Sequence, residues 1–180
     1  MKPDSILSWR LMRTEEVEIA NEISDLAQTE YPERPEIFEE RQMLFPKGAL
    51  VLSDQYDVVF GYCISHPWDS DRSPKLDTLI HWIPVKPTCY FVHDVGIARS
   101  VQARGYVQRL AEMLYEVARE YKCPEIRAVS VNGTLPLWKR IGAVVSTDED
   151  LLRYTKLAYD KRATPIYFNI EKVAPVAFGH

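Results

Sequence analysis

The sequence predicts one α/β (α+β) domain over residues 1–180, in which strands and helices follow one another along the chain. Three observations support this fold class. A chain of 180 residues fits one domain and buries about 70% of the surface that its unfolded form exposes. Hydrophobic residues make up 46% and charged residues 27%, a balance typical of globular proteins. Runs of β-branched and aromatic residues also alternate with segments whose apolar residues recur at helical spacing.

Charge and cysteine usage limit the classes of function. The formal net charge of −4 gives no basic field for nucleic acid or anionic membranes, so any anion site must be local. No segment has the apolar run of a signal peptide or a membrane span, and we expect a cytoplasmic protein. Cys63, Cys89 and Cys123 are widely spaced and odd in number, without metal-like spacing. We expect buried or idle thiols and no metal site.

The first half of the chain predicts a strand, two helices and a hairpin. Residues 6–12 form the first strand, and Thr14 is expected to cap a helix that ends near Tyr31. Val17, Ala20, Ile23 and Ala27 give this helix an apolar face. A second helix is expected over 36–44. The hairpin strands are 49–52 and 58–65, joined by the polar turn 53–57.

The second half opens with a long connection and then alternates strand and helix. The connection, 66–88, exceeds the usual loop length and is therefore expected to be functional. The remaining predicted elements are a strand over 90–97, a helix over 105–121, a strand over 126–131, a short helix over 134–140 and edge strands at 144–145 and 166–173.

An apolar strand, a basic turn containing Gly105 and a long amphipathic helix follow one another over residues 90–121. The first backbone N–H groups of a helix lack intrahelical partners, and with the helix dipole they favour an anion. Arg99, Arg104 and Arg109 add positive charge around the same point. This turn is therefore a candidate phosphate site.

Two motifs carry a family resemblance. The run Gln102-Ala103-Arg104-Gly105-Tyr106-Val107 resembles the Gln/Arg-x-x-Gly-x-Gly/Ala signature of the GNAT superfamily of acyl-CoA-dependent N-acetyltransferases, except that Val107 replaces Gly or Ala. Asn132, the aromatic Trp138 and Gly142 resemble its second signature. Over about residues 49–143, the chain loosely resembles the arylalkylamine N-acetyltransferase branch, through Trp68-Asp69, Leu79-Ile80-His81, His93 and Leu135-Pro136-Leu137-Trp138.

The resemblance implies the GNAT fold, a twisted mixed, mostly antiparallel sheet with helices on both faces. It also implies acetyl-CoA as cosubstrate. In the family, the strand before the loop splays from its neighbour, and its backbone groups hold the pantetheine arm and polarise the thioester. The residues implied to bind the cosubstrate are Val95, Gly96, Ile97, Gln102, Ala103, Arg104, Gly105, Tyr106, Val107, Asn132 and Trp138.

His93 matches the histidine that removes a proton from the acceptor ammonium in this branch, and its ordinary pKa near 6.5 suits a base. A core imidazole is the alternative. The branch's second histidine is replaced by Phe91, so a relay would need His81 from the loop. Strand alternation predicts Phe91, His93, Val95 and Ile97 on one face. Asp94 would then lie outside the pocket of His93 and pair with an arginine of the neighbouring helix.

Two departures from the family pattern bear on chemistry. Trp138 stands where most relatives carry a tyrosine that protonates the departing thiolate, and an indole N–H is not a usable acid. Tyr154, Tyr159 and Tyr167 lie too far from any motif to be ranked as replacements. Val107 either meets the phosphate or, as we favour, faces the core with Leu110 and Leu114.

The resemblance thus implies transfer of the acetyl group of acetyl-CoA to a primary amine by direct attack, with a small (aryl)alkylamine as acceptor. The alternative is a catalytically weak or inactive acyl-CoA-binding module. No nucleic acid or membrane partner is expected, and a homodimer is left open. Aromatic residues (Tyr31, Phe38, Phe45, Trp68, Trp82 and Tyr90) would supply the acceptor pocket. Glutamates (Glu33, Glu36, Glu39 and Glu40) would either favour a cationic amine or form the solvated side of a helix.

Overall fold

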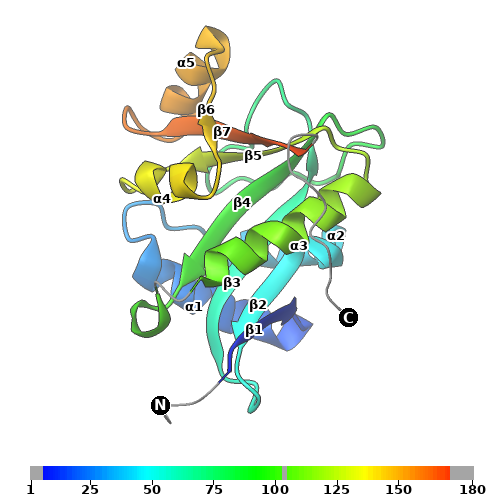
Figure 1. The fold of residues 1–180 in the computed structure, drawn as a ribbon, viewed down its shortest axis with the longest axis vertical. Helices are drawn as coiled ribbons and strands as arrows, with labels where there is room; N and C mark the ends of the chain where they lie inside the picture. The colour runs from blue at the N-terminus through cyan, green and yellow to red at the C-terminus, as the bar shows by residue number, and fades with distance from the viewer. Residues whose placement is uncertain (1–5, 103–104, 171–180) are drawn as a thin grey trace.

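A computed structural model describes residues 6–102 and 105–170. Its centre is a seven-stranded sheet in the order β1-β2-β3-β4-β5-β7-β6 (Figure 1). Among the described strands, β4 and β5 pair in parallel and all other neighbours pair antiparallel. This confirms the predicted mixed, mostly antiparallel sheet. The strands are β1 Ser8–Leu11, β2 Ala49–Ser53, β3 Val59–Trp68, β4 Cys89–Ile97, β5 Glu125–Ser130, β6 Val144–Val145 and β7 Thr164–Asn169.

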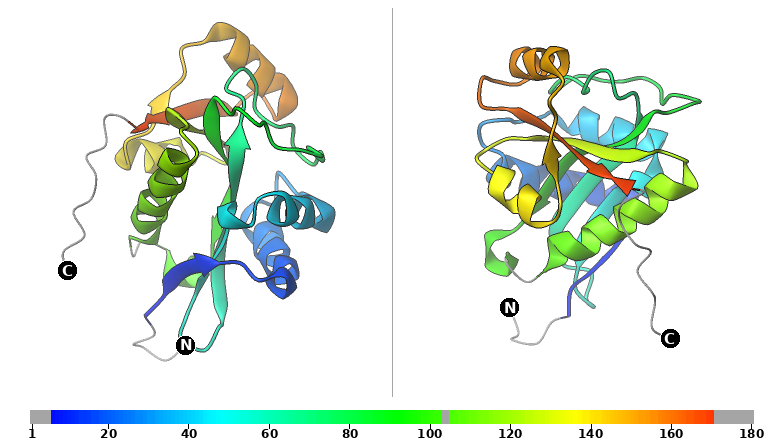
Figure 2. Two further views of the ribbon diagram at one scale, coloured as in Figure 1. Left: turned by 90° about the vertical axis from the view of Figure 1, so that its right-hand side faces the viewer. Right: turned by 45° about the horizontal axis from the view of Figure 1, so that its top comes forward.

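Helices cover both faces of this sheet, with α1 and α2 on one side and α3 on the other (Figure 2). The α-helices are α1 Val17–Ala27, α2 Pro35–Leu44, α3 Tyr106–Glu120, α4 Leu135–Arg140 and α5 Glu149–Ala158. Short 3-10 turns are η1 Thr14–Glu16, η2 Pro46–Gly48 and η3 Arg99–Val101. No helix within the described residues is long and apolar enough to cross a bilayer.

Two hydrophobic clusters hold these layers together. Leu110 and Leu114 of α3 pack with Leu52 of β2 and Val92 of β4. On the opposite face, Ile37 and Phe38 of α2 join Val17 and Ala20 of α1 against Val51, Tyr62 and Ile64. A strand points successive side chains to opposite faces, so the strands contribute apolar side chains to both clusters. The two clusters fix α1, α2 and α3 relative to β4, which carries His93.

Most predicted elements appear within a few residues of their expected bounds, with five differences. Thr14 begins the turn η1 instead of capping a helix, and α1 ends at Ala27, earlier than expected. Strand β3 continues through Trp68, so the long connection is shorter than predicted. Helix α5 was not predicted. Strand β7 begins at Thr164, and the predicted end at Val173 lies outside the described residues.

The parallel pair β4 and β5 separates after three residues. Tyr90, Phe91 and Val92 are in register with Ile126, Arg127 and Ala128, and the pairing stops there although both strands continue. The antiparallel pairing of β4 with β3 extends through Ile97. One edge of β4 is therefore open from His93 onward, at a fork between two central strands.

Candidate active site

A cavity of about 650 Å³ occupies this fork. Its walls come from the end of α1, the segment after it, β4, the start of α3, β5 and α4. Ten of the residues that the sequence singled out line it: His93, Val95, Gly96, Ile97, Gln102, Gly105, Tyr106, Val107, Asn132 and Trp138. Ala103 and Arg104 lie outside the described residues. The fold thus brings residues of both sequence motifs to the wall of one cavity.

The start of α3 has the features of an anion site. Gly105 precedes the helix with φ +77°, a left-handed conformation that favours glycine, and a Cβ there would meet no atom of the described residues within 4 Å. Among the described residues, no side chain caps the first N–H groups of α3. The Gln102 side chain donates to the carbonyl of Ile97 at 2.8 Å and ties the loop to β4. These groups at the cavity edge suit a phosphate.

The favoured placement of Val107 in the core is wrong. Val107 lines the cavity, whereas Tyr106, one residue earlier, packs against the core cluster that contains Leu110. The apolar repeat of α3 is satisfied by either residue, so the sequence could not separate them. A branched side chain therefore lines the cavity beside the start of α3.

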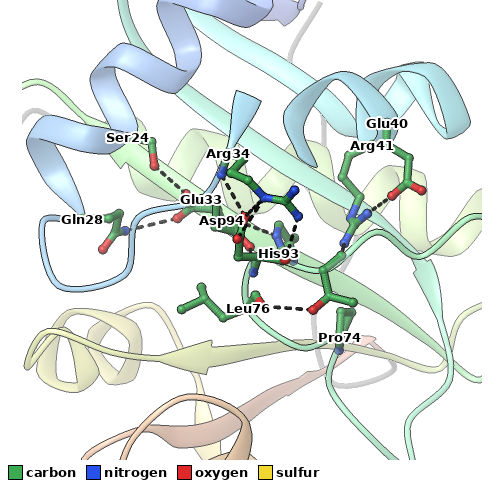
Figure 3. Close-up of polar contacts among 12 residues, drawn as sticks. Ser24, Gln28, Glu33, Arg34, Glu40, Arg41, Pro74, Leu76, His93 and Asp94 are labelled. Carbon is green, nitrogen blue, oxygen red and sulfur yellow. Dashed lines mark hydrogen bonds and ion pairs between the residues drawn. The ribbon is translucent and has the colours of Figure 1, made fainter. Parts of the chain in front are cut away.

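His93 lies at the fork and is almost fully enclosed. Its Nε2 is 2.8 Å from Oε2 of Glu33, and the two side chains are 2% and 3% exposed (Figure 3). The pKa of the Glu33 carboxyl is lowered: burial acts to raise it, but the charge of His93, their hydrogen bond, the hydrogen bond from the Asp77 N–H and the charge of Arg41 together outweigh burial. Glu33 comes from the segment between α1 and α2, sixty positions away along the chain.

The predicted alternation of β4 fails at His93, because His93 is a β-bulge. Asp94 is in register with Ile64 and Val92 with Ser65, so His93 has no partner on β3. The extra residue reverses the faces beyond it. Asp94 therefore lines the same cavity as His93, contrary to the prediction.

Asp94 also pairs differently from the prediction, since no arginine contacts it among the described residues. Its Oδ2 accepts from the hydroxyls of Tyr62 at 2.6 Å and Ser24 at 3.2 Å. Its Oδ1 accepts from Gln28 at 3.1 Å and from the N–H of Val95 at 2.8 Å. Burial raises the pKa of this carboxyl, and the Tyr62 hydroxyl opposes the shift. Gly96 leaves room for the Tyr62 ring, because a Cβ there would lie 2.5 Å from it.

Gln28, a residue that the sequence did not single out, bridges the two sides of the fork. Its amide donates to Asp94 and, at 3.4 Å, to the carbonyl of Val95, and it accepts from Asn132 at 2.7 Å. Both backbone groups of Val95 are thus engaged by side chains. A thioester that used them would have to replace Gln28 and Asp94.

Trp138 belongs to both the cavity wall and the core, where its ring lies 6.2 Å from that of Phe168. Tyr159, which follows α5, also lines the cavity, although the sequence left it unranked as a proton donor because it lies far from the motifs. Its hydroxyl donates to the carbonyl of Pro74 at 2.8 Å, and burial raises its pKa. Leu76 lines the cavity from the same long connection.

The histidine beside His93 is His66, not His81. The His81 side chain is 74% exposed, near Glu40, whereas the rings of His66 and His93 lie 6.3 Å apart. Burial lowers the pKa of His66 to about 3, so it stays neutral. His66 occupies the extension of β3, which the sequence assigned to the loop.

The predicted acceptor residues separate into several environments. Of the aromatic set, Tyr31 lines the cavity, Phe38, Phe45 and Tyr90 are buried in the core clusters, and Trp82 stacks near Trp68 while 58% exposed. Of the glutamates, Glu33 lines the cavity, Glu36 and Glu39 are exposed, and Glu40 is buried against Arg41. The cysteines Cys63, Cys89 and Cys123 are buried, as predicted.

Comparison with solved structures shows a shared fold. The chain is similar to the loading GNATL domain of CurA from Lyngbya majuscula, at 13% identity over 93% of this chain and all of that chain, with a TM-score of 0.73. It is similar to Chaetomium thermophilum Naa20, solved with a bisubstrate analogue, at 16% identity over 96% of this chain and 90% of that chain (TM-score 0.66). N-acetylglutamate synthase from Neisseria gonorrhoeae, complexed with coenzyme A and N-acetyl-glutamate, matches at 12% identity over 93% of this chain and 36% of that chain (TM-score 0.62).

Sequence comparison gives the family. No curated protein matches the chain. The model of the acetyltransferase (GNAT) family matches residues 15–143, well over half of the chain. This range contains the start of α3, the fork and both motifs. The chain therefore belongs to the GNAT acetyltransferase family.

Proposed function

We propose that this protein transfers the acetyl group of acetyl-CoA to a primary amine, and that the acceptor is a small (aryl)alkylamine. One observation carries this proposal: the fork between β4 and β5 opens into a cavity that has the start of α3 at one part of its wall and His93 at another. The candidate phosphate site and the candidate base thus line the same cavity. Each is suited to one of the two substrates.

The residues present fit acetyl-CoA. The N–H groups of α3 beside Gly105, which no described side chain caps or blocks, would hold phosphate. The open edge of β4 would take the pantetheine arm by strand-like hydrogen bonds. CoA bound to the Neisseria synthase in this fold supports the same assignment. Gln28 and Asp94 would exchange their contacts with Val95 for contacts with the entering thioester.

His93 would supply the base. An alkylammonium gives one proton to the imidazole, and the neutral amine then attacks the thioester carbonyl carbon. A C–N bond forms and the C–S bond breaks as the intermediate collapses. The thiolate takes the second amine proton and leaves as free thiol, and the imidazolium returns its proton to water. No covalent enzyme intermediate is needed.

The wall near His93 suits a cationic amine with an apolar body. Glu33 and Asp94 supply negative charge there, while Tyr31, Leu76 and Tyr159 supply aromatic and aliphatic surface. This composition supports an arylalkylamine over an anionic acceptor. An acidic substrate would meet two carboxylates.

A non-catalytic acyl-CoA-binding module is the second candidate. It is favoured by Trp138, which lines the cavity but cannot protonate a thiolate, and by the engagement of Val95 by Asp94. A thiol is acidic enough, with an ordinary pKa near 8.5, to leave without a dedicated acid. Trp138 therefore bears on rate more than on the identity of the reaction.

Thiol release from acetyl-CoA distinguishes the two candidates. The protein is incubated with acetyl-CoA and a panel containing 2-phenylethylamine, tryptamine, a polyamine, an aminoglycoside and a lysine peptide, and free thiol is detected colorimetrically. Release that depends on an arylalkylamine is expected. Stabilisation by acetyl-CoA in a thermal melt without release from any amine would instead identify a binding module. A protein that shows neither thermal stabilisation by acetyl-CoA nor thiol release would exclude both the acetyltransferase and the binding module.

A further inference from the structure

Glu33 is the carboxylate that touches the imidazole of His93. Its Oε2 lies 2.8 Å from Nε2, and both side chains are nearly inaccessible to solvent (Figure 3). The family signatures do not include Glu33, and the sequence presented it as one of several glutamates around α2. In the structure it differs from Glu36 and Glu39, which are exposed.

Two segments far apart in the sequence hold Glu33 in place. Its second oxygen, Oε1, accepts the N–H of Asp77 at 2.8 Å, and its backbone carbonyl accepts from the Asn21 side chain at 3.0 Å. Asp77 is in turn fixed by the neighbouring Arg34, whose backbone N–H and guanidinium both donate to the Asp77 carboxylate at 2.9–3.1 Å. The long connection between β3 and β4 therefore immobilises this carboxylate.

The two oxygens of Glu33 determine which nitrogen of His93 carries the proton. Because an ionised carboxylate only accepts hydrogen bonds, Nε2 of neutral His93 must be the protonated nitrogen. The lone pair then stays on Nδ1, which is buried and has no hydrogen-bond partner among the described residues. A proton accepted at Nδ1 would create an imidazolium in direct contact with the Glu33 carboxylate.

We propose that Glu33 is the positioning residue of this site: it fixes the Nε2–H tautomer of His93, keeps Nδ1 free as the base, and stabilises the imidazolium. This inference rests on the proposed acetyl transfer for its kinetic consequence, but not for the tautomer. The same logic applies wherever an acid orients a catalytic imidazole.

The other charged and titratable groups around His93 either have their own hydrogen-bond or ion-pair partners or stay neutral. Asp94 accepts four hydrogen bonds, from Tyr62, Ser24, Gln28 and the Val95 N–H. Arg41 is paired with Glu40, and its guanidinium also donates to the carbonyl of Thr78. The Tyr159 hydroxyl donates to Pro74, and His66 stays neutral. Glu33 alone among the described carboxylates is hydrogen-bonded to the His93 ring.

The substitution E33Q tests this role because a glutamine has one acceptor where Glu33 uses two. If its oxygen keeps the Asp77 N–H, its NH₂ faces Nε2 of His93 and forces the proton to Nδ1. The variant would then hold a correctly placed ring in the wrong tautomer. E36Q removes the same charge from an exposed position nearby and serves as the matched control.

The tautomer is read by ¹⁵N NMR of histidine-labelled protein, with the pH raised until the ring signals of His93 stop changing and the imidazole is neutral. The signals of His93 are assigned by their loss in H93Q. We expect the Nε2–H tautomer in the wild type and in E36Q, and the Nδ1–H tautomer in E33Q. With acetyl-CoA and 2-phenylethylamine, E33Q should lower kcat at least about tenfold with an unchanged KM for acetyl-CoA.

An Nδ1–H tautomer in the wild type would overturn the inference, and so would an E33Q protein with wild-type spectrum and kcat. The wild-type spectrum alone decides the matter if E33Q does not fold. Since the spectrum needs no substrate, a protein that shows the Nε2–H tautomer but releases no thiol with any amine would refute the proposed function and leave the role of Glu33 in orienting His93 intact.

Discussion

At the scale of single residues, the site depends on side chains that the sequence could name only in part. His93 was identified through its place before Gly105, and it lines the cavity. Glu33, Gln28 and Tyr159 also line it but carry no motif of their own. Their positions follow from tertiary contacts over 60 or more residues, such as Gln28 with Asp94 and Asn132. A local sequence pattern cannot encode such contacts, so only the structure could place these residues in the cavity wall.

Trp138→Tyr tests the chemical departure from the family. The phenol would supply the acid that most relatives use for the thiolate, so kcat should be kept or raised, most clearly above about pH 8, where solvent protonates a thiolate least readily. The smaller ring should leave a cavity beside Phe168 that costs about 1 kcal/mol of stability. The rate is measured by thiol release. Trp82→Tyr, at an indole that is 58% exposed, is the control.

A tenfold or larger fall in kcat in Trp138→Tyr, with folding and acetyl-CoA binding retained, would contradict this expectation. It would mean that the indole itself shapes the cavity wall. The Trp82→Tyr control should leave both kcat and the melting temperature unchanged.

At the scale of elements, the sequence predicted type and order well because the apolar periods of the strands and of α3 are strong. It placed the faces of β4 wrongly beyond His93, since a β-bulge leaves no mark in the alternation of a run such as Phe91-Val-His-Asp-Val95. Helix α5 was missed although a signal was present. Asp148 accepts from the N–H groups of Asp150 and Leu151, an N-cap, but only Leu151 and Thr155 of the helix are buried.

Gly105→Glu tests the start of α3 as the phosphate site. A carboxylate there would repel phosphate, and a side chain is strained at φ +77°. Acetyl-CoA should raise the melting temperature of the wild type by mass action, and the variant should lose this shift. Gly133→Glu is the matched control, because Gly133 has φ +70° and an equally open Cβ position but is not part of the cavity wall.

The two glycine variants should therefore differ in ligand response more than in basal stability. If Gly105→Glu keeps the full acetyl-CoA shift, the phosphates bind elsewhere. Loss of the shift in Gly133→Glu to the same extent would assign the effect to backbone strain.

At the scale of the whole molecule, the two hydrophobic clusters fix helices on opposite faces of the sheet, and the fork opens where the parallel pair ends. The sequence resemblance predicted this architecture. It could not predict that the interior also encloses an imidazole, His66, that must stay neutral. That burial links the stability of the fold to pH.

Acid should destabilise the protein through His66. Its pKa is lowered to about 3 by burial, whereas in the unfolded chain it is near 6.5. Between these values the unfolded state binds the extra proton, so the stabilising contribution is present above about pH 6.5 and is lost as pH falls toward 3. Between about pH 7 and 5, the wild type should lose about 1 to 2 kcal/mol more unfolding free energy in urea than His66→Phe.

His81→Phe, at an exposed ring, should retain the pH dependence of the wild type. An identical loss of stability on acidification in the wild type and His66→Phe would show that other groups carry the acid sensitivity.

The central claim is that the cavity at the fork is an acetyltransferase site with His93 as its base. The most direct measurement is kcat for thiol release from acetyl-CoA, with the most active amine of the panel, in the wild type and His93→Ala between about pH 6 and 9. We expect a fall of about 10²-fold in the variant, with acetyl-CoA affinity nearly unchanged. Equal kcat across this range, in a folded variant that binds acetyl-CoA, would contradict it.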